Sequence, residues 1–253
     1  MLSSTTSLHF TIIDETDDYV VVDKPPFLLV HPTKPNAAPT LWKQLRELLA
    51  FEIAGGGQVS TVNRLDRETS GLVLVAKTSA AARKFGMLMQ ERRLKKEYLA
   101  IVWGWPDWES KTVDAPIVRQ GEIKQSKIYL KQTIHRQGAK AVTEFEVSRR
   151  FRKHTTNGES FSLVKAQPST GRTHQIRVHL ASLGHPIVGD KLYGPDENFY
   201  LRFIETGWTD ELASKLLLER HALHASRLRI DERRDWSSAL PKDLSDWMER
   251  GRS

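Results

Sequence analysis

The sequence predicts an α+β fold, because helical and strand patterns are mixed along the chain without the regular strand–helix–strand alternation of a parallel sheet. Residues 113–166 consist of short alternating segments separated by turn signals, which is typical of antiparallel strands. No linker-like segment separates two bodies, so we expect one domain within the 253 residues.

The elements expected first along the chain are a strand, a loop and a helix. Tyr19–Val22 is a buried strand that ends at Lys24-Pro25-Pro26, because proline cannot donate a ladder hydrogen bond. Pro32–Pro39 is a proline-rich loop. Thr40 is a suitable N-cap for a helix to about Ile53, which Gly55-Gly56-Gly57 then ends. The apolar face of this helix consists of Leu41, Leu45, Leu48 and Leu49.

A strand, a helix and a second strand should follow. Leu72–Ala76 is continuously apolar, and Ser79 is a suitable N-cap for a helix to about Arg93. The apolar stripe of that helix is Ala82, Phe85, Leu88 and Met89. Tyr98–Trp103 has the composition of a strand.

Beyond the antiparallel region, the pattern becomes helical again. Thr173–Leu183 predicts a helix that ends at Gly184 and Pro186. A last helix is expected over Asp210–Glu219, followed by a strand around Leu228–Ile230.

Composition excludes several classes of protein. The chain has no cysteine, which rules out a disulfide scaffold, a thiolate metal site and a cysteine nucleophile. Its longest apolar runs, such as Gly71–Ala76, are far shorter than the ~20 residues that span a bilayer. Met1–Ser7 has neither the basic nor the apolar region of a secretory signal, so we expect a cytoplasmic protein without membrane contact.

The net charge favours an anionic partner. Lys and Arg number 38 against 31 Asp and Glu, which gives a formal charge of +7. Three separate clusters carry much of the positive charge, namely Arg92–Lys96, Arg149–Lys153 and the arginines of Arg227–Arg234. Each cluster alone is typical of a solvated face, but together they indicate a phosphate-rich partner.

The densest group of ionisable residues is Asn63–Gly71, between a short strand and a strongly apolar one. It fits a charged surface turn in which Gly71 supplies backbone freedom. It also fits a catalytic loop, because neighbouring arginines would keep Asp66 ionised and able to act as a nucleophile or base.

A second group, Ser169–His179, spans the start of a predicted helix. Gly171 lets the backbone approach a ligand, and free N–H groups there favour anions. Thr173 and Arg177 should share a helix face, and Arg177 lies beside the apolar stripe, where it requires an acidic partner. His174 and His179 lack the spacing of a helical zinc pair, so no metal is expected.

Two further segments are less informative alone. Lys95-Lys96-Glu97-Tyr98 fits a basic helix end that continues into a strand with a half-buried tyrosine. Gly55-Gly56-Gly57 is not a phosphate loop, because no Gly-Lys-Ser/Thr follows it.

Together these segments resemble the RluA-type family of RNA pseudouridine synthases. The family signature His-Arg-Leu-Asp-x-x-Thr-Ser-Gly matches residues 63–71, with Asn63 at the histidine position. The early pattern Lys-Pro-x-Gly-Leu-x-Val-His-Pro matches residues 24–32, with Phe27 at the glycine position. The remaining matches are Lys96-Glu97-Tyr98, residues 171–179, residues 184–190 and Tyr193-Gly194. The resemblance extends over about residues 19–230.

The resemblance implies a pseudouridine synthase fold, a mixed and largely antiparallel sheet with flanking helices and a central basic cleft. It implies that Asp66 is the catalytic aspartate, that Tyr98 stacks on the target base and that Arg177 pairs with the aspartate. Arg64 would fill the gap left by the flipped nucleotide. The other expected substrate-binding residues are Arg67, Thr69, Arg172, His174 and Gln175.

The implied reaction moves the glycosidic bond of uridine from N1 to C5, which is an isomerisation that needs no cofactor or metal. The target base must first leave its stack. Whether Asp66 attacks the ribose, attacks the base or removes a proton is left open. We expect Asn63 to support the loop without loss of activity, whereas Phe27 leaves the conformation of the early loop in question.

The resemblance also implies domain boundaries and partners. We expect an N-terminal segment at 1–16, a catalytic domain at 17–232 and a C-terminal extension at 233–253, with too few residues before Tyr19 for the S4 domain of many relatives. The expected partner is tRNA or rRNA, and the expected state is a monomer. The alternatives are a non-catalytic RNA-binding protein and a hydrolase that uses Asp66 on a small anionic substrate.

Overall fold

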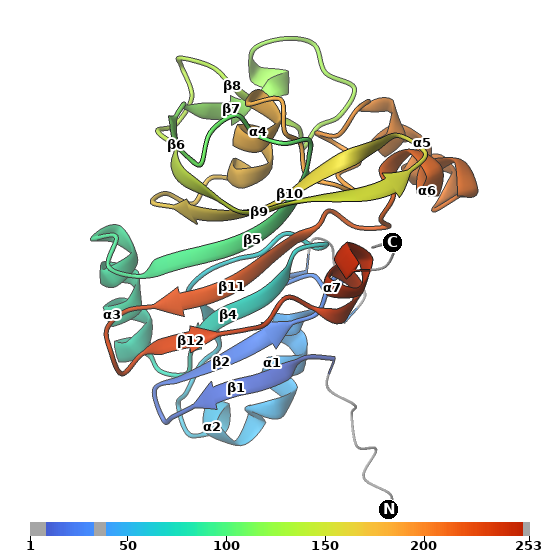
Figure 1. The fold of residues 1–253 in the computed structure, drawn as a ribbon. Helices are drawn as coiled ribbons and strands as arrows, with labels where there is room; N and C mark the ends of the chain where they lie inside the picture. Colours follow the sequence, from blue (N-terminus) through green and yellow to red (C-terminus); the bar gives the residue numbers. More distant parts are fainter. Residues whose placement is uncertain (1–8, 33–38, 250–253) are drawn as a thin grey trace, which may run out of the picture. The chain divides into compact units, whose positions relative to one another are not determined.

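The computed structural model describes residues 9–32 and 39–249 (Figure 1). These residues fall into two compact units. The first unit contains Met1–Leu94 and Ala225–Ser238, and the second contains Lys95–His224 and Ala239–Ser253. Helices flank mostly antiparallel strands, so the predicted α+β class is confirmed. Most of the proline-rich loop expected at Pro32–Pro39 lies outside the described residues.

The strands of the first unit include the two most apolar segments of the chain. Neighbouring strands are β1 (Thr11–Glu15), β2 (Tyr19–Lys24), β4 (Ser70–Ala76) and β11 (Leu223–Arg229), with β3 (Ser60–Thr61) on β4 and β12 (Asp235–Ser237) on β11. Val20–Val22 and Leu72–Ala76 are fully buried. Strands this apolar need cover, and Phe85 and Leu88 of α3 (Ser79–Gln90) pack against Leu72 and Leu74.

The helices of the first unit correct the sequence analysis in two places. Thr40 caps α1 (Leu41–Leu48) as predicted, but the helix is interrupted at buried Leu49 before α2 (Ala50–Ala54), and Leu48 is exposed. The buried face of α1 therefore includes Leu41 and Leu45 but not Leu48. The N-cap of α3 is Thr78 rather than Ser79, because the hydroxyl of Thr78 accepts from the Ala81 N–H.

Gly71 allows β4 to approach β11. Its φ is +112°, and a Cβ added there would lie 2.3 Å from the Ala225 carbonyl oxygen.

We expect Gly71→Ala to lower the free energy of unfolding by about 2–4 kcal/mol, through backbone strain and overpacking. Urea denaturation measures this. Gly56→Ala is the control, because Gly56 also has a positive φ but its Cβ would meet nothing within 4 Å. Equal losses in the two variants would contradict the steric explanation.

The strands of the second unit confirm the antiparallel pattern predicted for residues 113–166. In order, β5 (Lys95–Trp103), β10 (Gly158–Pro168), β9 (Val142–Thr155) and β6 (Ser110–Asp114) are antiparallel neighbours. A separate pair is formed by β7 (Ile117–Arg119) and β8 (Gln132–Ile134), with a short 3₁₀ turn, Gln120–Glu122, between them.

The helices of the second unit are α4 (Gln175–Ser182), α5 (Asn198–Thr206), α6 (Asp210–Leu216) and α7 (Lys242–Glu249). Helix α4 begins two residues later than predicted, because His174 has a left-handed backbone with φ +56°. Thr173 therefore precedes the helix and does not share a face with Arg177. Helix α6 ends at Leu216 because Leu217 is also left-handed. Helices α5 and α7 and strands β1 and β12 were not predicted, and β11 begins five residues before the strand expected around Leu228–Ile230.

Candidate active site

The loop between β3 and β4 carries most of residues 63–71, here called the first motif, and is held on β4 by Asn63. The Asn63 side chain is buried; its Nδ2 donates to the Leu72 carbonyl at 3.0 Å, and its Oδ1 accepts from the Leu74 N–H at 2.8 Å. An amide supplies both a donor and an acceptor, so asparagine satisfies two main-chain groups of one strand. The expectation that Asn63 supports the loop agrees with this geometry.

Removing that amide should destabilise the first unit. We expect Asn63→Ala to lower the free energy of unfolding by about 2–3 kcal/mol, because two buried main-chain groups of β4 lose their partners. Thermal or urea denaturation measures the loss. Asn63→His should retain more of this stability than Asn63→Ala, since imidazole also offers a donor and an acceptor. An unchanged midpoint in Asn63→Ala would show that water replaces the amide.

Asp66 lies on a tight turn of this loop. Its carbonyl accepts from the Thr69 N–H at 3.2 Å, and its side chain is half-buried. Arg64 and Arg67 are exposed on either side, whereas Thr69 is buried. Arg64 also faces the early motif: burial lowers the pKa of His31, and the charge of Arg64 lowers it further.

Lys24 joins the early motif to the Asp66 loop, a role that the sequence analysis missed. Its side chain is fully buried, and Nζ donates to the carbonyls of Pro25 at 2.8 Å, Leu28 at 2.9 Å and Arg67 at 3.3 Å. A buried ammonium is costly unless it is hydrogen-bonded, so these contacts fix both loops. The only signal in the sequence was the position of Lys24 in the early motif.

Tyr98 lies on β5 in the second unit, opposite Ala166 of β10, and is buried. Lys96 and Tyr98 project from the same face of the strand, because side chains alternate with a period of two. The Lys96 Nζ donates to the Thr170 carbonyl at 3.3 Å, and burial lowers the pKa of Lys96. The segment Lys96-Glu97-Tyr98, here called the third motif, is therefore in contact with Ser169–His179, the second motif.

Gln175 determines the shape of the second motif. Its Oε1 accepts from the Thr170 hydroxyl at 2.7 Å and from the Arg172 N–H at 3.0 Å. Its Nε2 donates to the Val142 carbonyl and to the Thr143 hydroxyl, both at 2.9 Å. The amide is thus engaged by the protein itself, and direct substrate binding by Gln175 stays a prediction.

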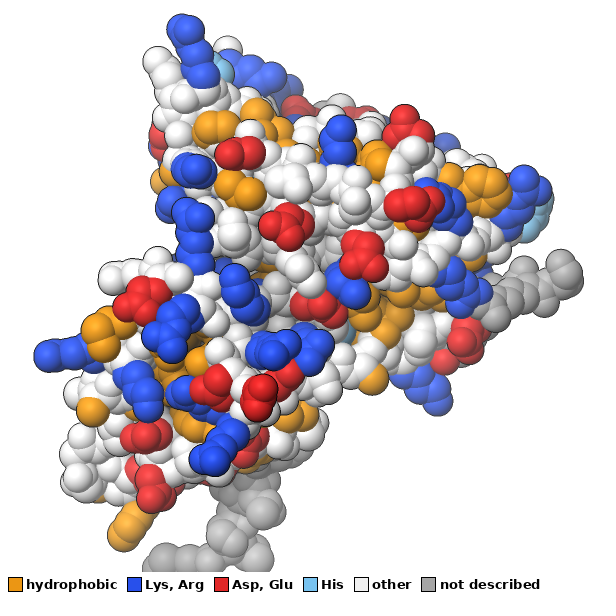
Figure 2. Space-filling view, turned by 60° about the vertical axis from the view of Figure 1, so that its left-hand side comes forward, with side chains coloured by type: hydrophobic (Ala, Val, Ile, Leu, Met, Phe, Trp, Pro, Cys, Tyr) orange, Lys and Arg blue, Asp and Glu red, His pale blue; other side chains and the backbone are white. Residues whose placement is uncertain are grey.

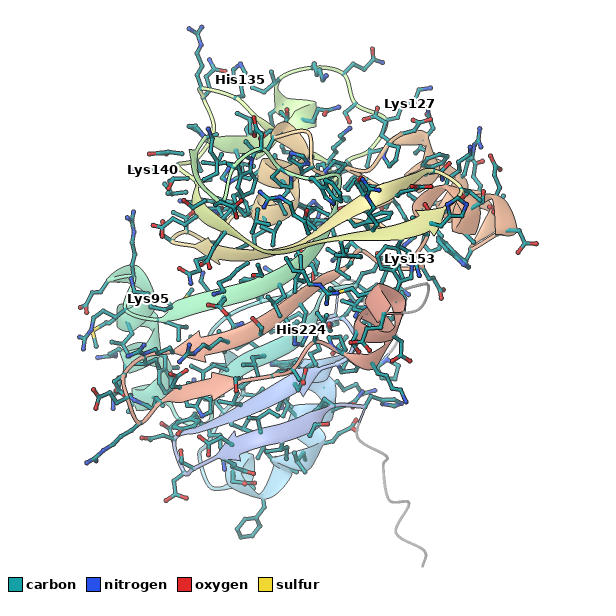
Figure 3. All side chains as sticks on the ribbon, in the orientation of Figure 1. Lys95, Lys127, His135, Lys140, Lys153 and His224 are labelled. Carbon is teal, nitrogen blue, oxygen red and sulfur yellow. The ribbon has the colours of Figure 1, made fainter. Side chains whose placement is uncertain are left out.

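The exposed side of this loop carries Arg172 and His174. The Arg172 Nε donates to the carbonyl of Lys140, a residue labelled in Figure 3, at 3.1 Å. The left-handed backbone of His174 turns its ring toward Tyr193, whose hydroxyl lies 2.8 Å from Nδ1. That hydroxyl also accepts from the Gln132 N–H at 2.9 Å. His174 is therefore held in a fixed orientation.

Arg177 has the acidic partner that the sequence analysis required. Its Nε donates to Asp190 Oδ2 at 2.6 Å, and its Nη2 donates to Oδ1 at 2.9 Å. The fully buried Asp190 also accepts from the N–H groups of Leu192 and Tyr193. Burial alone would raise the pKa of Asp190, but the charge and hydrogen bonds of Arg177 outweigh it and hold the pKa well below its usual range.

Asp190 was not predicted to have a role, although its segment belongs to the family pattern. Its bidentate contact fixes the plane of the guanidinium, which is the geometry arginine needs to bind a second anion in a defined direction. The predicted pairing of Arg177 with Asp66 stays a prediction.

The candidate residues belong to two units. Arg64, Asp66, Arg67 and Thr69 lie in the first unit, and Tyr98, Arg172, His174, Gln175 and Arg177 lie in the second. Within each unit, hydrogen bonds to main-chain groups hold the loops that carry these residues.

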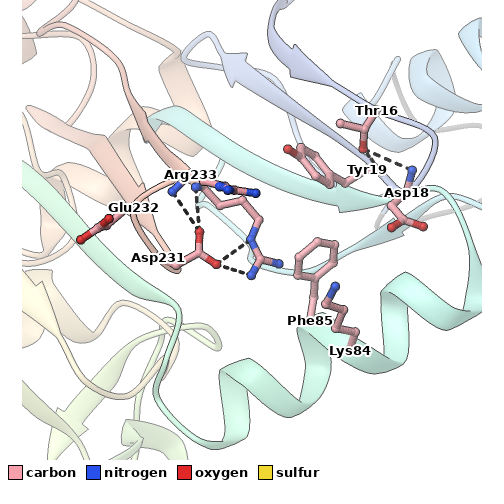
Figure 4. A pocket seen from close by; sticks show the side chains of 9 residues that line it. Thr16, Asp18, Tyr19, Lys84, Phe85, Asp231, Glu232 and Arg233 are labelled. Carbon is pink, nitrogen blue, oxygen red and sulfur yellow. Dashed lines mark hydrogen bonds and ion pairs between the residues drawn. The ribbon is translucent and has the colours of Figure 1, made fainter.

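Within the described residues, 9–32 and 39–249, no three His, Asp or Glu side chains are grouped so as to hold a metal ion. None of the helices in these ranges has the length and apolar character of a membrane span. The first unit also has an open pocket, lined by Lys84, Phe85 and Asp231 among others (Figure 4). No residue of the three motifs lines that pocket.

A sequence model of the RNA pseudouridylate synthase family matches residues 18–182, which include the Asp66 loop, Tyr98 and Arg177. The chain belongs to this family and is an RNA pseudouridine synthase, an isomerase of uridine in RNA.

Individual relatives are similar over nearly the whole chain. Ribosomal large subunit pseudouridine synthase D of Pasteurella multocida is 34% identical, over 96% of this chain and 71% of that protein. The synthase D of Pseudomonas aeruginosa is 36% identical, over 94% of this chain and 70% of that protein. The solved structure of human RNA Pseudouridylate Synthase Domain Containing 4 aligns with a TM-score of 0.70 at 26% identity, covering 95% of this chain and 92% of that one.

Proposed function

We propose that this pseudouridine synthase modifies uridine in large-subunit ribosomal RNA and that Asp66 is its catalytic residue. The fixed turn that presents Asp66 carries the catalytic part of the proposal, because buried Lys24 and Asn63 hold the loop from two sides. The names of the relatives support the choice of RNA, since several are ribosomal large subunit synthases of bacteria.

The proposed chemistry needs a carboxylate and no redox partner. The N1–C1′ bond of uridine breaks, the base turns over, a bond forms between C5 and C1′, the proton on C5 leaves and N1 gains a proton. Asp66 starts this sequence as an ionised group, by attack on the ribose or the base or by removal of a proton beside C1′. No cofactor is needed for a net isomerisation.

The other candidate residues have positioning and binding roles in this proposal. Arg177, with its plane fixed by Asp190, pairs with Asp66 and keeps that carboxylate ionised. Tyr98 stacks on the flipped base, and Arg64 occupies the vacated position in the RNA stack. Arg67, Thr69, Arg172 and His174 complete the contacts to the nucleotide and its phosphates.

The basic clusters differ in how well they support an RNA partner. In the cluster Arg149–Lys153, the Arg152 guanidinium lies 5.1 Å from the centre of the Trp105 ring. The Nζ of Lys153, the one residue of this cluster labelled in Figure 3, lies 5.2 Å from the centre of the Trp247 ring. Cations beside aromatic rings are typical of surfaces that bind unpaired RNA. By contrast, in the Arg227–Arg234 cluster Asp231 and Asp235 pair with three of the arginines. Figure 2 shows basic and acidic side chains interspersed on the face of the molecule that it presents.

We also propose the domain boundaries, the oligomeric state and the cellular location that go with this activity. Residues 17–232 form the catalytic domain, and the protein acts as a monomer in the cytoplasm, where ribosomal RNA is available. The bacterial relatives support this location.

The test is an assay of the purified protein on unmodified large-subunit rRNA and on bulk tRNA transcripts, with pseudouridine mapped by position. Modification of a defined uridine in the rRNA supports the proposal. Modification confined to tRNA would overturn the choice of substrate, and RNA binding without any pseudouridine would overturn the catalytic role of Asp66.

A further inference from the structure

Phe27 combines two features that rarely occur together. Its backbone is left-handed, with φ +67°, and its aromatic side chain is 39% exposed. A left-handed backbone is unfavourable for any residue with a Cβ and is an outlier for a bulky one. Core packing does not explain the aromatic side chain, since much of the ring faces solvent. Such strain, held by the surrounding structure, is typical of functional sites.

Hydrogen bonds from Lys24 hold the loop around Phe27 in this conformation. The buried Lys24 Nζ donates to the carbonyls of Pro25 and Leu28 on either side of Phe27, so the loop cannot relax without breaking these bonds. The same ammonium donates to the Arg67 carbonyl, which ties the Phe27 loop to the Asp66 loop. Phe27 therefore has a fixed position relative to the candidate catalytic loop.

The ring of Phe27 also has a cationic neighbour. The guanidinium carbon of Arg67 lies 5.9 Å from the ring centroid, within the range of a cation–π contact. Arg67 is itself exposed. An exposed aromatic face beside an exposed guanidinium can stack on a nucleobase and contact the adjoining phosphate, as single-stranded nucleic acids require.

We infer that Phe27 and Arg67 form a stacking site for an unpaired nucleotide that neighbours the target uridine in the RNA. This inference rests on the proposed function, because the site is built onto the Asp66 loop. Phe27 is a positioning residue: its ring holds the flanking base, and Arg67 holds the phosphate, so that the target uridine reaches Asp66.

The experiment compares Phe27→Gly, Phe27→Trp and the control Phe51→Ala. Glycine tolerates the left-handed backbone and removes the ring, so Phe27→Gly should keep or raise the melting temperature. It should nevertheless weaken binding of a labelled single-stranded oligouridylate by about 5- to 150-fold, the range for one base–aromatic stack. Phe27→Trp should bind as the wild type does. Phe51 is 89% exposed in the same unit, and Phe51→Ala should change nothing.

A second probe separates stacking from charge. An abasic ribose-phosphate oligomer of the same length should bind the wild type and Phe27→Gly equally, because it has no bases to stack. Equal affinity of these two proteins for oligouridylate would overturn the inference, as would an equal loss in Phe51→Ala. These binding measurements do not depend on catalysis. An inactive wild type that loses oligouridylate affinity in Phe27→Gly would overturn the proposed function and leave the stacking site standing.

Discussion

Replacement of Asp66 by asparagine should lower the rate of pseudouridine formation by about 10³-fold or more, the size of effect expected when a catalytic acid, base or nucleophile is removed. Asparagine has nearly the shape of aspartate but cannot attack carbon or take up a proton. The main-chain bond that closes the turn from Thr69 to Asp66 does not involve the side chain, so the loop should keep its form. RNA affinity should change little.

The measurement is single-turnover formation of pseudouridine at saturating enzyme, together with RNA binding and a melting curve. Asp17→Asn is the matched control, because Asp17 is an exposed aspartate of the same unit outside all three motifs. Full activity in Asp66→Asn would refute the catalytic assignment. A parallel loss of binding and melting temperature would instead assign Asp66 to the fold.

Replacement of Asp190 by alanine should lower the free energy of unfolding by about 3–5 kcal/mol, the cost of breaking a buried ion pair from one side. Arg177 and Asp190 are both buried, and two hydrogen bonds join them. The carboxylate also accepts from the N–H groups of Leu192 and Tyr193, so its loss disturbs the turn that orients His174. Urea denaturation checks the loss, and Asp107→Asn is an exposed control in the same unit.

The same carboxylate should contribute to acid sensitivity. Its pKa is lower in the folded protein than in the unfolded chain, because Arg177 and the hydrogen bonds outweigh burial. Its stabilising contribution is therefore complete above the ordinary aspartate pKa of ~3.9 and is lost as the pH falls toward the folded-state value. In Asp190→Asn, the free energy of unfolding should decrease less steeply as the pH falls below about 5. If the free energy of unfolding of this variant depended on pH below about 5 as that of the wild type does, the contribution of Asp190 to acid sensitivity would be contradicted.

Much of the fold follows from local patterns. The strands at β2 and β4 and the helix capped by Thr40 were predicted, because apolar spacing and a capping hydroxyl are properties of adjacent residues. The errors lie where tertiary contacts prevail over local pattern. Helix α4 starts late because His174 takes a left-handed backbone and bonds to Tyr193, nineteen residues further along.

The candidate site shows the same division. The motif around Asp66 is contiguous, so its chemistry could be proposed from residue types alone. Sequence position also indicated that Arg177 needs an acidic partner, since a cation beside an apolar stripe must be compensated. It could not indicate Asp190 as a partner, because the spacing of thirteen residues follows no helix or strand period.

The sequence by itself determined the fold class, the family and the residue types available for catalysis, because these depend on local periodicity and on contiguous motifs. Only the tertiary structure decided which groups hold the candidate catalytic loops in place. Lys24 donates to Arg67 across 43 residues of sequence, and Asn63 bonds to β4 through main-chain groups that carry no sequence signal. The strained backbone of Phe27 is likewise set by these long-range bonds, since no local preference of phenylalanine favours a positive φ.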